Sequence, residues 1–329
     1  GGSFAGLATA RILQLLGMSV EVFERFPVLR EGGAGIGVDD VSVECLHAIG
    51  LGDAFLRRQS LPMRRQIHVT SGRTLFRSAF PYRACYWNDI YQLLYNSLPR
   101  GTVSFQHNVV GVAQDVEGGG VTLTLENGAR REVDVLFGCD GPTSTIRKIL
   151  HPRCTPRYRG YTAWRGYLHH EDAKPGVVEG LYDFYDELAA GAIYFHVASA
   201  ESGHLVVYEL PPASATSGPK INFLWYVGRE AHGELLGSGK DVGRDRRITA
   251  EAKAEEVEAM RSAATAFWPA PVARFIEAVQ SPFMNDIYDA DPVRASWGRG
   301  KVTLIGDAAH PVTPHFLKSS NMAIHDALE

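Results

Sequence analysis

Three glycine-containing turns, spread over the whole chain, constrain the fold of this sequence more than any other feature. The last follows the apolar run Val302–Ile305 and consists of Gly306 and Asp307. A second, Asp140-Gly141, follows another strand-like run, and the chain itself opens on Gly-Gly-Ser-Phe-Ala-Gly at 1–6. Turns at the ends of strands place backbone and carboxylate groups beside a ligand. Three of them predict one extended cofactor.

The first 24 residues have the pattern of a dinucleotide-binding unit. The glycines of segment 1–6 precede apolar residues at helical spacing up to Leu16, and Val20–Glu24 is typical of a strand that ends in an acid. In such a unit the backbone approaches a pyrophosphate at the helix N-terminus, and the acid binds a ribose. A glycine-rich turn without a ligand is the alternative. The predicted cofactor contacts here are Gly1, Ser3, Phe4, Gly6, Glu24 and Arg25.

The order of the predicted elements indicates an α/β protein with a second domain inserted into the first. Three segments rich in β-branched and aromatic residues predict an antiparallel sheet: 193–197, 205–210 and 221–227. Buried-strand patterns at 133–137 and 301–305 instead fit a Rossmann-like domain. The expected boundaries are 1–158 for the first part of the cofactor domain, 159–283 for the inserted domain with a contribution from 63–86, and 284–329 for the second part.

Several local features leave alternatives open. Asp140 is a candidate cofactor contact, but it also suits the turn or N-cap before a helix at 144–150. The glycine-rich segment 32–37 is either a flexible loop or a close approach of the backbone to a ligand. Further helices are expected at 249–264 and 272–280, and segment 211–219 is expected to be a surface loop.

The composition is that of an ordinary water-soluble enzyme. The 329 residues are 45% hydrophobic, and the formal net charge of −4 gives no reason to expect a nucleic-acid or membrane-surface partner. No apolar stretch approaches the roughly 20 residues of a membrane span. The four cysteines lack metal-binding spacing, so we expect reduced thiols, no metal site and a cytoplasmic location. A dinucleotide unit has a strand ahead of its loop and none precedes Gly1, so we expect a fragment or a wrong start, and an organellar signal stays open.

Together these motifs resemble the para-hydroxybenzoate hydroxylase-like family of flavin monooxygenases, over essentially the whole chain. The resemblance implies that Glu24 binds the ribose of FAD, that Asp140 serves both flavin and nicotinamide cofactors, and that Asp307 holds the ribityl chain. It also adds Gly306, Pro314 and Asn321 to the expected FAD contacts. Three segments look most like the dihydroxypyridine hydroxylase branch: Tyr161–Gly166, His204–Tyr208 and Asn222–Tyr226.

The chain departs from the family pattern at two places. Trp87 stands where the family usually has an arginine near the flavin, which removes one expected charge contact. Leu317, Lys318 and Ser319 replace the usual Gly-Gln-Gly after the Gly-Asp motif. Because residues other than glycine restrict φ, this replacement bears on how the backbone surrounds the flavin ring.

The reaction implied by the resemblance is hydroxylation of an electron-rich aromatic or heteroaromatic ring. NADH or NADPH would reduce the flavin, molecular oxygen would form a flavin hydroperoxide, and the ring would attack its distal oxygen. The protein would then supply a base poised near neutral pH. His204 and Tyr208 are four residues apart on one predicted strand, so they share a face of the sheet and are the predicted catalytic pair.

The sequence leaves alternatives open for the catalytic residues and for the function. A strand-edge histidine beside a packed tyrosine is the structural alternative for the predicted pair, and His196 and Tyr226 are the second candidates. We expect His310 to be structural and Arg165 to pair with a carboxylate or to cap a strand. A flavin-binding protein or truncated fragment without hydroxylase activity is the alternative function, and a homodimer is an open expectation. An NAD-only dehydrogenase would leave Gly306-Asp307 unexplained.

Overall fold

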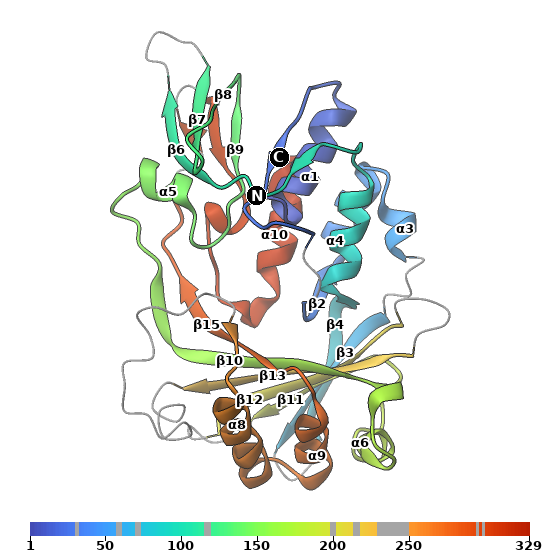
Figure 1. Ribbon diagram of the computed structural model, residues 1–329. Coiled ribbons are helices and arrows are strands. Elements are labelled where there is room, and N and C mark those ends of the chain that lie inside the picture. Colours follow the sequence, from blue (N-terminus) through green and yellow to red (C-terminus); the bar gives the residue numbers. More distant parts are fainter. Residues whose placement is uncertain are drawn as a thin grey trace.

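The computed structural model describes residues 1–29, 33–56, 61–69, 74–114, 120–197, 202–212, 218–228, 250–293, 296–297 and 300–329. Within these residues the strands form four sheets, one of nine strands and three smaller ones (Figure 1). The nine-stranded sheet, here called the large sheet, crosses the molecule between two groups of helices.

The large sheet draws its strands from both halves of the chain. In spatial order they are β14 (Ala250–Glu251), β15 (Phe283–Asp289), β10 (Arg157–His169), β13 (Lys220–Gly228), β12 (His204–Leu210), β11 (Ala192–Val197), β3 (Leu61–Val69), β4 (Thr74–Tyr86) and β2 (Gly35–Asp39). The paired strands run antiparallel except for β3 and β11, which are parallel. The three segments predicted to form an antiparallel sheet are β11, β12 and β13, and they pair antiparallel as predicted; the parallel pair joins β11 to β3. The predicted boundaries of the two domains stay a prediction.

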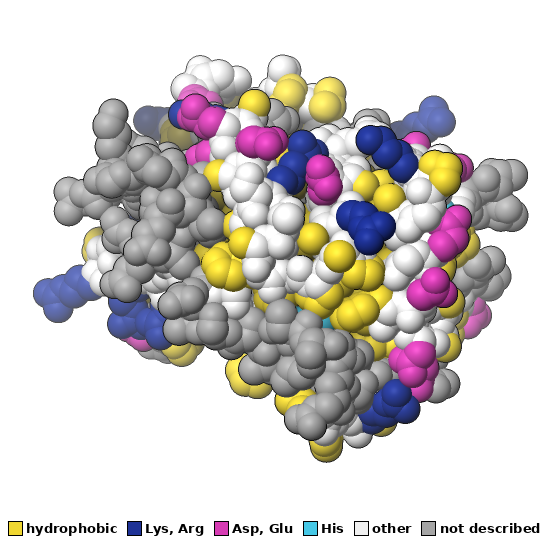
Figure 2. All heavy atoms as spheres, turned by 90° about the horizontal axis from the view of Figure 1, so that it is seen from below, with side chains coloured by type: hydrophobic (Ala, Val, Ile, Leu, Met, Phe, Trp, Pro, Cys, Tyr) yellow, Lys and Arg dark blue, Asp and Glu magenta, His cyan; other side chains and the backbone are white. Residues whose placement is uncertain are grey.

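The two faces of the large sheet bury different partners because side chains alternate along each strand. On β13, Phe223 and Trp225 join a core with α6 (Val177–Phe184), α8 (Ala254–Phe267) and α9 (Ala270–Ala278). Leu224 and Tyr226 point to the opposite face, toward β4 and the first part of the chain. Figure 2 views the helix-covered side from below, where acidic, basic and hydrophobic side chains are interspersed.

The remaining elements, apart from η1 (His170–Asp172) beside α6, lie above the other face of the large sheet (Figure 1). The helices are α1 (Phe4–Leu15), α2 (Asp40–Ala48), α3 (Gly52–Leu56), α4 (Trp87–Asn96), α5 (Thr145–Leu150) and α10 (Lys318–Leu328), and short 3₁₀ turns are η1 (His170–Asp172), η3 (Gly306–Ala308) and η4 (Pro314–Phe316). The small sheets are β1 (Val22–Phe23) with β5 (Val103–Ser104), β6 (Val109–Gln114) with β7 (Val121–Leu125) and β8 (Arg130–Val133), and β16 (Ser296–Trp297) with β17 (Val302–Leu304) and β9 (Leu136–Gly138). Helix α1 and strand β9 thus come from distant parts of the sequence but lie together.

Three local expectations need correction. The strand predicted at 133–137 is two strands, because Val133 pairs with Val121 in one sheet and Leu136 pairs with Val302 in another. The strand predicted at 20–24 pairs only at Val22–Phe23. The glycine-rich segment is not a flexible loop from Gly35 onward, because Gly35 and the residues after it form the edge strand β2, while a close approach of its backbone to a ligand stays a prediction. Residues 30–32 and 213–217, parts of the glycine-rich segment and of the predicted surface loop, lie outside the described residues.

The close approach of Tyr208 explains why position 35 of the edge strand β2 is a glycine. A Cβ on Gly35 would overlap the ring and hydroxyl of Tyr208, and the Gly35 N–H donates to Asn222 Oδ1 at 3.0 Å. This contact joins β2 to the middle of the large sheet. Among the described residues, no helix is long and apolar enough to cross a membrane.

Two glycines provide a matched test of packing on the helix-covered face. A Cβ on Gly166 of β10 would lie 2.7 Å from Val279 Cγ1 and 2.9 Å from Phe223 Cε1, whereas one on Gly180 in α6 would meet no atom within 4 Å. We expect Gly166→Ala to lower the free energy of unfolding by about 1–3 kcal/mol through overpacking. Gly180→Ala should instead raise it by about 0.5–1 kcal/mol, because alanine loses less entropy in a helix. Denaturant unfolding of both variants checks this; equal effects would contradict the packing argument.

Candidate active site

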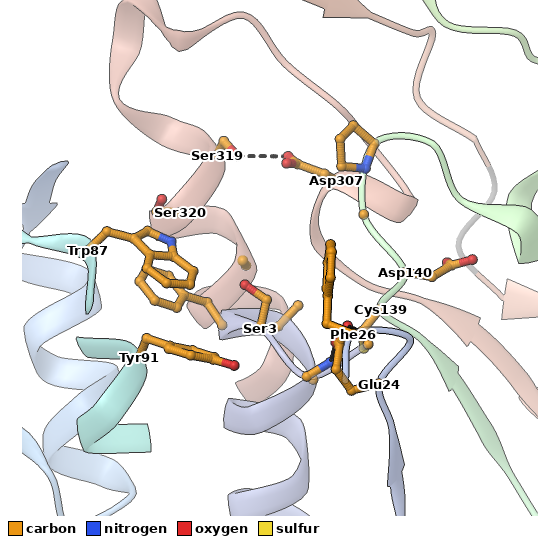
Figure 3. Close-up of a pocket in the computed structure, with 18 of the residues that line it drawn as sticks. Ser3, Glu24, Phe26, Trp87, Tyr91, Cys139, Asp140, Asp307, Ser319 and Ser320 are labelled. Atoms are coloured by element: carbon orange, nitrogen blue, oxygen red, sulfur yellow. Dashed lines mark hydrogen bonds between the residues drawn. The ribbon is translucent and has the colours of Figure 1, made fainter. Parts of the chain in front are cut away.

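One large cavity runs from the first turn of α1 to the face of the large sheet that the helices leave open. Its volume is about 2480 Å³, beyond the roughly 300–1,000 Å³ of ordinary small-molecule pockets. Figure 3 shows Trp87 and Tyr91 on one side of it and Glu24, Phe26 and Cys139 on the other, with Ser3 between them. The cavity therefore has room for a dinucleotide-sized cofactor together with a second ligand.

The glycine loop, residues 1–6, exposes backbone groups at one end of this cavity. Side chains on Gly1 or Gly6 would collide with the carbonyl oxygens of Cys139 and Gly1, so both positions require glycine. Residues Ser3 to Gly6 line the cavity, and the N–H groups of the first turn of α1 have no carbonyl one turn earlier to bind. Such a helix start attracts the charge of a phosphate. Ser3 does not use its hydroxyl to cap α1.

The Glu24 carboxylate fixes the shape of this loop. Its Oε2 accepts the Gly2 N–H at 2.6 Å, and its Oε1 accepts the Phe26 N–H at 3.0 Å. Each carboxylate oxygen accepts two hydrogen bonds, so one position on each remains for a ribose hydroxyl. The neighbouring Arg25 is exposed, lines the same cavity and lies over the ring of Phe26.

Asp307 stands at the cavity wall in the turn that follows β17. Its Oδ1 accepts the hydroxyl of Ser319 at 2.8 Å (Figure 3), and burial raises the pKa of its carboxyl. The turn is held from behind by Asp326, whose Oδ2 accepts from Gly306 N at 2.7 Å and binds His310 Nε2 at 2.7 Å. His310 therefore has the structural role that was expected. The sequence analysis identified Ser319 only as part of the segment that replaces Gly-Gln-Gly and did not predict its hydrogen bond to Asp307.

Asp140 acts in the structure as a cap for α5. Its carboxylate accepts the N–H of Thr145 at 2.7 Å, that of Ile146 at 3.1 Å, and the hydroxyl of Ser144. This geometry matches the structural alternative for this aspartate. Asp140 also lines the cavity, so its predicted contact with the flavin and nicotinamide cofactors stays a prediction.

A buried arginine that the sequence did not reveal links the second and third turns. Arg147, with no exposed surface, donates from Nη1 to the carbonyls of Asp307 and Ala308, each at 2.8 Å, and from Nη2 to that of Pro142. Burial lowers the pKa of this guanidinium. The signal available in the sequence was an arginine beside Lys148 in a short helical segment, which does not by itself indicate a partner.

Aromatic stacking replaces the expected arginine near the start of α4. The ring of Trp87 stacks on Phe4 at 5.3 Å and on Tyr91 at 4.6 Å between centroids. Trp87, Tyr91 and Phe4 all line the cavity. An uncharged, flat surface therefore stands here in place of a charge contact.

The segment that replaces Gly-Gln-Gly keeps a glycine-like backbone at its first position. Leu317 has φ +54° and ψ 24°, in the left-handed region, at a cost of roughly 1–2 kcal/mol for a side-chain-bearing residue. Lys318 Nζ then binds Asp39 Oδ2 at 2.8 Å. Pro314, an expected cofactor contact, lines the cavity just before this segment.

The side chain of Asn321 forms hydrogen bonds within the protein, and its expected contact with FAD stays a prediction. Its Oδ1 accepts from Asp39 N at 3.0 Å and from Ser42 Oγ at 2.7 Å, and its Nδ2 donates to the carbonyls of Gly37 and Leu317. All four hydrogen-bonding positions of the amide are thereby used within the protein. Asn321 joins β2 and α2 to α10.

Side chains of β10 and β13 form the floor of the cavity at its far end. Arg165 and Tyr167 of β10 and Leu224 and Tyr226 of β13 line it. The second candidate Tyr226 thus lies on the cavity wall, with burial raising the pKa of its phenol. His196, the other second candidate, lies on the opposite face of the sheet, where its Nε2 contacts the hydroxyl of buried Tyr185.

The predicted pair His204 and Tyr208 does not line this cavity in the described structure. Tyr208 lies on the same face of the large sheet as the cavity, but its side chain is buried beneath Gly35. His204 stacks on Tyr226 at 4.5 Å and lies 5.4 Å from the ring of His315. Burial and the nearby His315 lower the pKa of His204 to about 4. The prediction of a base poised near neutral pH is therefore wrong for His204, while the catalytic role of Tyr208 stays a prediction.

Comparison with known proteins identifies two family matches along the chain. Residues 1–165 match the model of an FAD binding domain, and residues 158–289 match that of an FAD binding domain-like family. A 3-amino-4-hydroxybenzoate 2-monooxygenase from Streptomyces platensis is 30% identical over 99% of this chain and 76% of its own. The chain belongs to the FAD-binding aromatic monooxygenases. It is an FAD-dependent hydroxylase of aromatic or heteroaromatic rings.

Other relatives of this monooxygenase support the predicted branch. A 2,6-dihydroxypyridine 3-monooxygenase from Paenarthrobacter nicotinovorans is 28% identical over 99% of this chain and 79% of its own. The solved structure of 2,6-dihydroxypyridine-3-hydroxylase from Arthrobacter nicotinovorans matches with a TM-score of 0.82 and 26% identity, over 100% of this chain and 80% of that one. The residues present fit FAD, because the glycine loop, Glu24 and Asp307 lie along one cavity.

The two aspartates of this monooxygenase should respond differently to replacement. We expect Asp307→Ala to weaken FAD binding about 10- to 100-fold, because a hydrogen bond to a charged acceptor contributes roughly 1.5–3 kcal/mol. Asp140→Ala should weaken FAD binding less, and should lower the free energy of unfolding by about 0.5–2 kcal/mol through loss of the α5 cap. Titration of the apoproteins with FAD, beside denaturant unfolding, measures both effects. Unchanged FAD affinity in Asp307→Ala would refute its assignment.

The depressed pKa of His204 should make stability depend on pH. A free histidine has a pKa near 6.5, so between pH 6.5 and 4 the unfolded chain binds more protons at this position than the folded one. Stability should therefore fall as pH is lowered through this range, by up to about 3 kcal/mol from this residue. His204→Phe should flatten the dependence, whereas His47→Phe at an exposed position should not. Denaturant unfolding at several pH values measures this dependence. If the free energies of unfolding of wild type and His204→Phe change in parallel with pH, the lowered pKa assigned to His204 is contradicted.

Proposed function

We propose that this enzyme uses NADH or NADPH and molecular oxygen to hydroxylate an electron-rich aromatic or heteroaromatic ring bound on the floor of the large sheet. The observation that carries the proposal is the single cavity that joins the phosphate-binding loop, Asp307 and the strand residues Leu224 and Tyr226. Hydroxylation of a ring requires the substrate and the cofactor to share one enclosed space.

The chain's own residues would bind the cofactor in three places. The first turn of α1 would bind the pyrophosphate, Glu24 a ribose and Asp307 the ribityl chain. FAD, when bound, supplies the electrons and the activated oxygen. The stacked rings of Phe4, Trp87 and Tyr91 would offer apolar surface beside it.

The floor of the cavity would orient the ring and keep out water. Leu224 and Tyr167 supply apolar surface, and the phenol of Tyr226 supplies a hydrogen-bonding group at the wall. Because the pKa of Tyr226 is raised by burial, its hydroxyl stays protonated and can donate to an oxygen or nitrogen of the ring. His204, stacked behind this ring, stays neutral near pH 7 and would hold Tyr226 in place.

The proposal is tested by purifying the protein and screening ring compounds. The extracted cofactor should be FAD, and 2,6-dihydroxypyridine, 6-hydroxynicotinate or 3-amino-4-hydroxybenzoate should accelerate NADH or NADPH oxidation and gain one oxygen atom by mass spectrometry. Extraction of FMN, or oxidation without any oxygenated product from these rings, would count against the proposal.

Replacement of the wall phenol should uncouple the reaction. We expect Tyr226→Phe to lower the yield of hydroxylated product per NAD(P)H oxidised by about 2- to 10-fold, the effect of one lost hydrogen bond. FAD content should not change. Tyr95→Phe, whose side chain does not line the cavity, is the matched control. Unchanged coupling in Tyr226→Phe would exclude this role for Tyr226.

A further inference from the structure

Segment 317–319, here called the wall segment, is bound to the rest of the protein by its own side chains. Leu317 packs, partly buried, against side chains of the large sheet. The ammonium of Lys318 binds the carboxylate of Asp39, with 2.8 Å between Nζ and Oδ2. The family pattern has glycine at two of these three positions, and glycine has no side chain with which to form such contacts. The wall segment therefore has anchoring contacts that the family pattern lacks.

The ion pair of Lys318 holds the first turn of α10 against β2. A cation in the first turn of a helix is unfavourable in itself, because it lies at the positive end of the helix dipole. Asp39, the last residue of β2, offsets this charge. Burial by itself would raise the pKa of Asp39, but hydrogen bonds from Lys318 and Ser42 hold it below its ordinary value. Asp39 therefore stays ionised near pH 7, and the residue after Lys318 starts from a fixed position.

That residue, Ser319, contacts the carboxylate of Asp307 across the cavity wall (Figure 3). Its hydroxyl donates to Asp307 Oδ1 at 2.8 Å, and both residues line the cavity. The last torsion of an aspartate side chain has only a broad, roughly two-fold preference, so a partner is needed to fix the carboxylate. No described residue donates a hydrogen bond to Oδ2 of Asp307. The Ser319 bond therefore fixes the carboxylate and leaves Oδ2 able to accept from a ligand.

The same hydrogen bond favours the ionised form of Asp307. Burial raises the pKa of this carboxyl, whereas the hydrogen bond from Ser319 and the charges of His310 and Arg147 oppose that rise. An ionised acceptor forms a stronger hydrogen bond than a neutral one. Ser319 thus acts on both the direction and the charge of the side chain that is expected to hold the ribityl chain.

We infer that Ser319 is a positioning residue that orients the Asp307 carboxylate for FAD, a role that glycine at this position cannot fill. The inference rests on the proposed function, in which Asp307 binds the ribityl chain, and it adds a residue that determines cofactor affinity. A carboxylate already held in its binding orientation loses less freedom when the cofactor binds. Leu317 and Lys318 contribute by holding the segment that carries Ser319.

A double-mutant cycle on FAD binding tests whether Ser319 acts through Asp307. Dissociation constants come from titration of the apoproteins with FAD, followed by flavin fluorescence. We expect Ser319→Ala to weaken FAD binding about 3- to 10-fold, the effect of one hydrogen bond. In the Asp307→Ala background the same change should have no effect, because no carboxylate is left to orient. A role confined to the stability of α10 would instead lower FAD affinity equally in both backgrounds.

Three further variants assign the effect to the hydroxyl group. Ser319→Thr keeps this group and should bind FAD within about 2-fold of wild type, because the hydrogen bond is retained. Ser319→Gly, the residue of the family pattern, should weaken FAD binding at least as much as Ser319→Ala, since it also frees the backbone. Ser320→Ala is the matched control, because Ser320 lines the cavity beside Ser319 but forms no hydrogen bond with Asp307 in the described part of the protein. Its effect on FAD affinity should be the same with and without the Asp307 carboxylate.

Four results would overturn the inference: unchanged FAD affinity in Ser319→Ala, an equal loss in both backgrounds, an equal loss in Ser319→Thr and Ser319→Ala, or a coupling of Ser320 to Asp307 as large as that of Ser319. These are distinct from failure of the proposed function. If rings are hydroxylated and Asp307→Ala weakens FAD binding while Ser319→Ala does not, the hydroxylase function stands and the positioning role falls. If Ser319 and Asp307 are coupled in FAD binding but no ring gains oxygen, the positioning role stands and the hydroxylase function falls.

Discussion

The buried guanidinium of Arg147 is the interaction on which the geometry of the site depends. Its donors hold the carbonyls of Pro142, Asp307 and Ala308, which belong to turns more than 160 residues apart in sequence. Removing a charge from water is costly, and the hydrogen bonds from both Nη atoms of Arg147 offset part of that cost. The acceptors here are backbone groups, and this fixes the two turns relative to each other. The wall carrying Asp307 is therefore positioned against the segment that carries Asp140.

A second set of contacts joins this wall to the substrate end. Asn321 spans β2, α2 and α10 through a fully used amide, and Gly35 reaches Asn222 in the large sheet. Because β2 forms the edge of that sheet, the sheet that carries Tyr226 is tied to the helix that follows Asp307. Cofactor and substrate ends of the cavity are thus parts of one connected framework. Such a framework suits a reaction in which the ring must be held at a set distance from the cofactor.

Most of the cofactor end could be predicted from sequence because its chemistry is local. A glycine loop before a helix, an acid at the end of the next strand and a Gly-Asp turn are each contained in a few residues, and the family comparison agrees with the resemblance drawn from them. The substrate end was predicted less well. Strand periodicity correctly placed His204 and Tyr208 on one face, but it could not show that Gly35 covers one ring and that burial lowers the pKa of the other to about 4.

By itself, the sequence determined the order of the elements, the glycine-rich start of α1 and the cofactor class, since these follow from backbone freedom and short-range spacing. Only the tertiary structure decided which polar groups are already used. It assigned the amide of Asn321 and the carboxylate of Asp140 to the protein's own backbone, and it left Arg165 facing the cavity without a described partner. The physical reason is that hydrogen-bond satisfaction and desolvation depend on neighbours brought together from distant parts of the chain.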